Sequence, residues 1–144
     1  MNALQTILLA GFACGVLDGL SATALAGGHW VRLFQFVASG ILGPGAFKGG
    51  PATAGAGIAV HFFIATSAAA VYYLASRALP ILLSHALVAG ALYGATVHVF
   101  MNTVVIPLSA VQRPFSMRGF LTQLAVHMIV VGPSISLVVQ RYSR

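Results

Sequence analysis

Ionisable side chains stand inside the apolar stretches of this sequence. Asp18, the one acidic residue in the chain, interrupts GFACGVLDGL, and His61, His98 and His127 stand in later apolar runs. An ionisable group in the hydrocarbon region of a membrane costs about 2.5 to 3.5 kcal/mol on insertion scales, so its position points to function. One carboxylate and three imidazoles could bind a metal, ligate a pigment or move protons.

Each of these chemistries makes a distinct demand on the residues. A zinc, iron or copper site would use His61, His98, His127 and Asp18 as ligands. A haem or another tetrapyrrole would use the same histidines and needs a small residue one turn away, which Gly57 and Gly94 provide four residues before His61 and His98. A proton relay would use the carboxylate and the imidazoles in series. The structural alternative is a polar seam that only fixes helix register.

Enzymatic turnover has no support in the sequence. An HExxH motif is missing, and neither Cys14 nor Ser21 has a general base at a recognisable spacing. We therefore expect a protein that is not an enzyme.

Four apolar runs must position these residues. Hydrophobic residues make up 59% of the chain and charged residues 6%, which excludes a soluble globule. Runs long enough to cross a bilayer, roughly 20 residues each, occupy Leu4–Ala26, Ala52–Leu79, Ala86–Leu108 and Phe120–Val139. The sequence predicts one all-α domain, residues 1–144, that forms a four-helix antiparallel membrane bundle.

Depth and helical phase bring the polar residues together in this arrangement. Counting from the predicted helix ends places Asp18 and the three histidines roughly 10 to 15 Å deep, in one layer, at 1.5 Å per residue. At 100° per residue each of them shares a face with small or polar residues, as His98 does with Asn102 and His127 with Gln123. We expect Asp18 to pair with a histidine of another helix, within a polar network extended by Asn102 and Gln123.

The connections and the glycines complete the predicted fold. Residues 29–43 have apolar side chains at helical spacing, with Arg32, Gln35 and Ser39 on the other side, which indicates a short interfacial helix between the first two spans. The short connection from Pro80 to His85 predicts that the second and third spans pack as neighbours. A glycine zipper, Gly11-x-x-x-Gly15-x-x-x-Gly19, indicates close helix packing, and Gly132-Pro133 predicts a kink.

The formal charge of +6 comes from cations at the ends of the apolar runs, where lipid headgroups lie. No basic stripe with interleaved aromatics is present, so nucleic acid is not an expected partner. The expected partners are the lipid bilayer, other membrane subunits and further copies of the chain.

The segment HFFIATSAAAVYYLASRALP, followed by LVAGALYGATVHVFMNTVVIPLSA, resembles the YagU-like family of bacterial inner-membrane proteins. The resemblance covers the central and C-terminal half of the chain and rests on a histidine-containing helix that ends in proline, then a Gly/Ala-rich helix with an internal histidine and a terminal Pro-Leu. It implies a multi-pass protein of the bacterial inner membrane and a link to acid stress. Together with the residues, it favours a small accessory, assembly or stress-related subunit.

Overall fold

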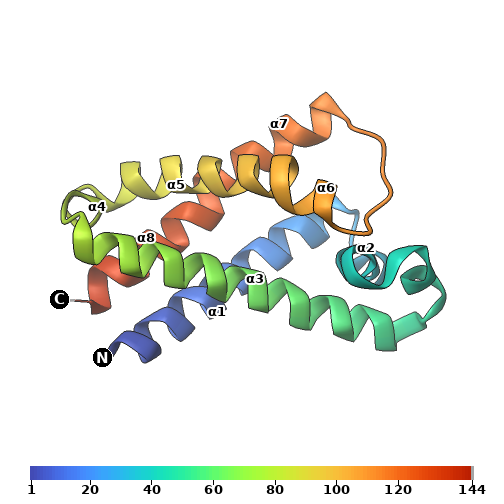
Figure 1. Cartoon of the computed structure of the whole chain (residues 1–144), viewed down its shortest axis with the longest axis horizontal. Helices are drawn as coiled ribbons and strands as arrows, with labels where there is room; N and C mark the ends of the chain where they lie inside the picture. Colours follow the sequence, from blue (N-terminus) through green and yellow to red (C-terminus); the bar gives the residue numbers. More distant parts are fainter. Residues whose placement is uncertain (144) are drawn as a thin grey trace.

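The computed structural model describes residues 1–143 and is helical along most of its length (Figure 1). Within these residues, four helices are long and apolar enough to cross a membrane: Ala3–Leu25, Gly50–Ala78, Ala86–Leu108 and Met117–Tyr142. The four predicted spans are thus confirmed, with ends that differ by at most three residues. This architecture suggests a multi-pass membrane protein.

Some spans contain more than one helical type. The elements in chain order are α1 (Ala3–Leu25), α2 (Trp30–Leu42), the 3-10 helix η1 (Gly43–Lys48), α3 (Gly50–Ala78), α4 (Ile81–Ser84), α5 (Ala86–Phe100), the π-helical η2 (Met101–Val105), α6 (Ile106–Leu108), α7 (Met117–Val126), the π-helical η3 (His127–Val131) and α8 (Gly132–Tyr142). The third span is therefore α5, η2 and α6 in succession, and the fourth is α7, η3 and α8.

The two π-helical segments have a common cause in the sequence. A proline lacks the backbone N–H and its ring clashes with the carbonyl four residues earlier. For Pro107 and Pro133 those carbonyls belong to Thr103 and Ile129, which lie inside η2 and η3. The helix accommodates each proline by a wider turn, and each wide turn falls where the span carries its polar residues.

Glycines set the closest packing between α1 and α3. A side chain at Gly11 would meet the backbone and side chain of Thr66, and one at Gly15 would meet the ring of Phe62. These two glycines of the predicted zipper therefore let α3 approach α1, as small residues do in membrane helices. Beside this contact, Cys14 and Tyr72 belong to a buried core that α8 completes with Ile135 and Val139.

The α2 helix exists as predicted, but its polar face is not the outer face. Gln35 is only 6% exposed and donates a hydrogen bond to the carbonyl of Gly50, while Ser39 is buried against the same side. Ile41, one of the apolar side chains within residues 29–43, is 70% exposed. The prediction assigned faces by polarity alone, whereas α2 packs along α3 and uses Gln35 to hold the backbone at the start of that helix.

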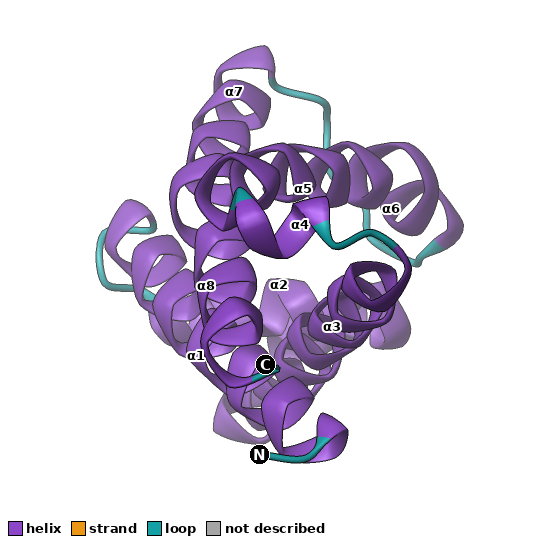
Figure 2. Ribbon diagram, turned by 90° about the vertical axis from the view of Figure 1, so that its left-hand side faces the viewer, coloured by secondary structure: helices purple, strands orange, loops and turns teal. Residues whose placement is uncertain are grey.

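The second and third spans are not packed on each other along their lengths, contrary to our expectation. The helix α1 packs against α3 and α8, and α8 packs against α5 (Figure 2). An open groove lies between α3 and α5. The short α4 joins these two helices at the end of the molecule where both termini lie (Figure 1). Side chains bridge the gap at one level, where the Tyr93 hydroxyl donates to the carbonyl of Ala68 at 2.7 Å.

Candidate functional site: an intramembrane cavity

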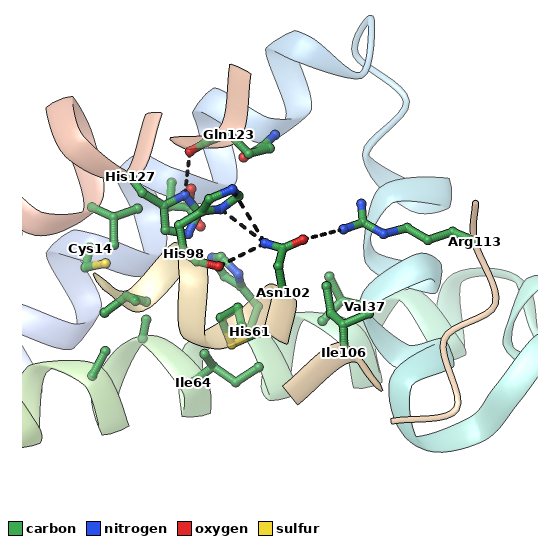
Figure 3. Close-up of a pocket in the computed structure, with 16 residues that line it drawn as sticks. Cys14, Val37, His61, Ile64, His98, Asn102, Ile106, Arg113, Gln123 and His127 are labelled. Carbon is green, nitrogen blue, oxygen red and sulfur yellow. Dashed lines mark hydrogen bonds between the residues drawn. The ribbon is translucent and has the colours of Figure 1, made fainter. Parts of the chain in front are cut away.

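One cavity of about 210 Å³ receives the polar residues singled out by depth and phase (Figure 3). Every long helix contributes to it. We call it the Asp/His cavity, and its polar lining residues are Asp18, His61, His98, Asn102, Arg113, Gln123 and His127. It lies beside the buried apolar core and toward α2 and the loop that follows α6.

His61 ties two helices together at the wall of the cavity. Its Nε2 lies 2.8 Å from the carbonyl oxygen of Gly15, so this nitrogen carries the proton and donates it. The rings of Phe34 and Phe62 meet the imidazole edge-on, with centroids 5.6 Å from it in both cases. The hydrogen bond and the two aromatic edges fix the orientation of His61, and its Nε2 is not free to bind a ligand.

His98 and His127 form the opposite wall. Their ring centroids are 4.9 Å apart, and Phe120 packs on the other side of His98 at 4.6 Å. The Nδ1 of His127 donates to the carbonyl of Gln123 at 2.8 Å, which leaves its Nε2 as a hydrogen-bond acceptor. His98 is only 3% exposed, and His127 is half-buried beside it.

Asn102 and Arg113 continue this wall toward the loop after α6. The Asn102 Nδ2 donates to the carbonyl of His98 at 2.9 Å, and its contacts with the imidazole nitrogens, at 3.4 and 3.5 Å, are too long to be strong hydrogen bonds. Its Oδ1 accepts from Arg113 at 3.0 Å (Figure 3). The guanidinium also lies over the ring of Phe36, 5.6 Å from its centroid, so Arg113 is held at the mouth of the cavity from two sides.

Arg113 was missed as a site residue, because the sequence places it among the cations between spans. The loop that carries it has no periodic pattern from which a side-chain direction could be derived. One local signal is the proline at residue 114, which favours an extended backbone at Arg113 and ends any continuation of the third span.

Asp18 lines the cavity without a partner in the protein. Within residues 1–143 its carboxylate makes no hydrogen bond or ion pair, and the expected pairing with a histidine is wrong. One reason is that His61, which lines the same cavity, turns its Nε2 to the backbone of Gly15. The cavity therefore contains an acid and a guanidinium that do not neutralise each other.

The tetrapyrrole interpretation is not supported by the packing. It needs open space beside Gly57 and Gly94. A side chain at Gly57 would instead meet the backbone carbonyl of Phe34, and one at Gly94 would meet the backbone carbonyl of His127. The backbone of a neighbouring helix lies directly against each glycine, so a macrocycle has no room one turn before His61 or His98.

The metal interpretation also lacks the geometry it requires. In the part of the chain that the structure describes, no group of three or more His, Cys, Asp or Glu side chains is arranged to hold a metal ion. His61, His98, His127 and Asp18 share a cavity but do not form a coordination sphere.

Comparison with protein-family models, with curated proteins and with solved structures finds no match to the chain. The geometry of the cavity is therefore the basis on which a function can be argued.

Proposed function

We propose that this chain is a non-enzymatic integral membrane protein, an accessory or binding subunit, and that the Asp/His cavity is its binding site. The observation that carries the proposal is the unneutralised pair of charges within one cavity of about 210 Å³. A seam that only fixed helix register would satisfy its own buried charges, because an unpaired charge is costly in an apolar environment. The partly buried Asp18 instead presents its charge to the cavity, and the exposed Arg113 lies at the mouth of the same cavity.

The shape of the interior favours a binding cavity over a proton relay. A relay needs a polar path to both sides of the membrane. Toward the termini the described interior is filled by Cys14, Tyr72, Ile135 and Val139 together with small apolar side chains. The cavity is thus open toward α2 and the loop after α6 and closed by apolar side chains toward the termini. A cavity closed at one end favours binding of a molecule over proton transfer across the membrane.

The apolar outer surface of the four spans and the family resemblance both support a location in a membrane. Large apolar side chains cover the outside of all four spans, among them Phe12, Phe63 and Leu92, and lipid or a neighbouring membrane subunit would match them. The YagU-like resemblance supports the bacterial inner membrane as the location, with a role in assembly or stress.

Cys14 supplies the test, because it is the one cysteine of the chain and it lines the cavity. Its side chain is 2% exposed, so a thiol reagent reaches it only through the cavity. We expect a small cationic methanethiosulfonate to modify Cys14 in folded protein reconstituted in nanodiscs. Val97→Phe, which introduces a ring into the cavity lining, should slow the reaction at least tenfold.

Val99→Phe is the matched control, because Val99 lies on the same helix, is exposed and does not line the cavity. It should leave the labelling rate unchanged. The thiolate is the species that reacts and burial suppresses it, so the labelling is run at raised pH. Failure of Cys14 to react there in folded protein, with full reaction after denaturation in SDS, would show a closed polar seam and refute the binding function.

A further inference from the structure

The gap between α3 and α5 is an apolar groove that adjoins the Asp/His cavity. It has a volume of about 430 Å³ and a nearly apolar lining. We call it the α3–α5 groove, and its walls include Ile64, Ala68, Val71, Val97, Phe100 and Met101. Ile64, Ala68, Val97 and Met101 also line the Asp/His cavity, so the two spaces adjoin at these four residues.

The dimensions of the groove match one leaflet of a bilayer. Along the third span its lining runs from Val105 back to Tyr93, which is about 18 Å at 1.5 Å per residue. The hydrocarbon core of a bilayer is about 30 Å thick, so one acyl chain reaches about half of that depth. The polar cavity lies at the end of the groove nearer to α2 and the loop after α6.

The charges of the cavity select the headgroup. Arg113 hydrogen-bonds to the neutral amide of Asn102 and lies over Phe36, and within residues 1–143 it pairs with no acid. Asp18 is unpaired in the same space. An anionic headgroup would pair with Arg113 and leave Asp18 facing a like charge. A cation alone would pair with Asp18 and leave Arg113 facing a like charge. A headgroup with a phosphate and a primary ammonium satisfies both, with charge-assisted hydrogen bonds at each end.

We propose that the chain binds one zwitterionic phospholipid of the ethanolamine type, with an acyl chain in the α3–α5 groove and its headgroup between Arg113 and Asp18. This inference rests on the proposed function of the cavity as a binding site. The lipid enters sideways from the bilayer. Asn102, Gln123 and His127 supply further donors and acceptors around the headgroup.

Native mass spectrometry of the full chain tests the headgroup without any mutation. Phosphatidylethanolamine, its N-acetyl derivative and phosphatidylglycerol, all with the same acyl chains, are titrated into delipidated protein. We expect phosphatidylethanolamine to bind at least about tenfold more tightly than either competitor, the scale of one lost charge-assisted hydrogen bond. Equal binding of the three lipids overturns the proposal.

Variants then locate the two halves of the lipid. Asp18→Asn should remove the preference for the ammonium headgroup, and Arg113→Gln should weaken all three phospholipids. Ala68→Phe should block the groove and weaken phosphatidylethanolamine at least fivefold, whereas Ala59→Phe, on an exposed part of the same helix outside the groove, should not. Circular dichroism and elution volume confirm that each variant folds, and a preference retained in Asp18→Asn contradicts the placement of the headgroup.

Further outcomes separate this inference from the proposed function. A lipid-free dimer that Ala68→Phe converts to a monomer would show that a second copy fills the groove, and it overturns the lipid proposal. A reactive Cys14 with no lipid preference refutes the lipid and retains the binding cavity, whereas a Cys14 that stays unreactive in nanodiscs without phosphatidylethanolamine refutes both. Protection of Cys14 by phosphatidylethanolamine, but not by its N-acetyl derivative, supports both.

Discussion

Gly94→Ala tests whether the polar wall of the cavity is held by direct backbone contact between helices. The added methyl group would meet the carbonyl of His127 and the backbone nitrogen of Gly132. Neither neighbour is the flexible end of a side chain, so α5 and the fourth span must move apart. That movement separates His98 from His127, whose rings are 4.9 Å apart in the native packing.

The magnitude is a balance of two effects. Overpacking of a close contact costs about 1 to 3 kcal/mol, and rigid backbone neighbours favour the upper end. Replacing glycine by alanine within a helix gains about 1 kcal/mol in helix propensity. The net loss is about 2 kcal/mol, or roughly a thirtyfold fall in the folding equilibrium constant.

Reversible unfolding in mixed micelles with increasing SDS measures this change. Gly55→Ala is the matched control, because Gly55 is exposed within α3 and an added methyl group would have no neighbour within 4 Å. It should be neutral or stabilising. A Gly94→Ala protein as stable as Gly55→Ala would refute the packing account, and with it the reason given against a tetrapyrrole beside His98.

Three further outcomes are expected. His61→Ala removes the hydrogen bond to Gly15, 2.8 Å long, and two aromatic edge contacts, and should lower the free energy of unfolding by about 1 to 3 kcal/mol in the same SDS assay; no change would show that His61 does not tie α3 to α1. Tyr93→Phe removes the bond to Ala68 across the groove, 2.7 Å long, and should cost about 0.5 to 1.5 kcal/mol, while Tyr73→Phe, whose hydroxyl has no protein partner among residues 1–143, should cost nothing measurable. Protein purified in detergent should show no visible absorption band, because neighbouring backbone occupies the space beside Gly57 and Gly94, and no stoichiometric metal by elemental analysis, because no group of three ligands is arranged for one among residues 1–143; a Soret band would overturn the first conclusion and a stoichiometric metal the second.

The spans and the depth of the cavity residues were accessible from the sequence for a simple reason. A helix has a fixed rise and rotation per residue, so counting from its ends gives the depth and face of each side chain. Asp18 lies in a regular α-helix, His98 lies just before the π-helical turn η2, and His127 begins η3, so the regular rise and rotation still apply at all three residues. The depth of each residue can therefore be derived without knowing which helix packs beside it.

What could not be predicted depends on contacts between elements. A glycine one turn before a histidine is equally compatible with a cofactor and with a neighbouring backbone, and only the packing shows that Gly57 and Gly94 face backbone. The direction of Arg113 depends on an irregular loop. The separation of α3 from α5 depends on the extra turn α4, which a short connecting sequence does not reveal.

The wide turns η2 and η3 also affect how this sequence should be compared with relatives. Each holds more residues per turn than an α-helix, so it acts as a one-residue insertion that the helix absorbs without a loop. Loss of one residue within η3 would close this turn to an ordinary α-helical turn, so Ile135 and Val139 would keep their places in the core. The same loss within α8 would instead turn everything beyond it by about 100° around the helix axis. A homologue shorter by one residue at η3 can therefore keep the same inward-facing residues in its last eleven-residue helix.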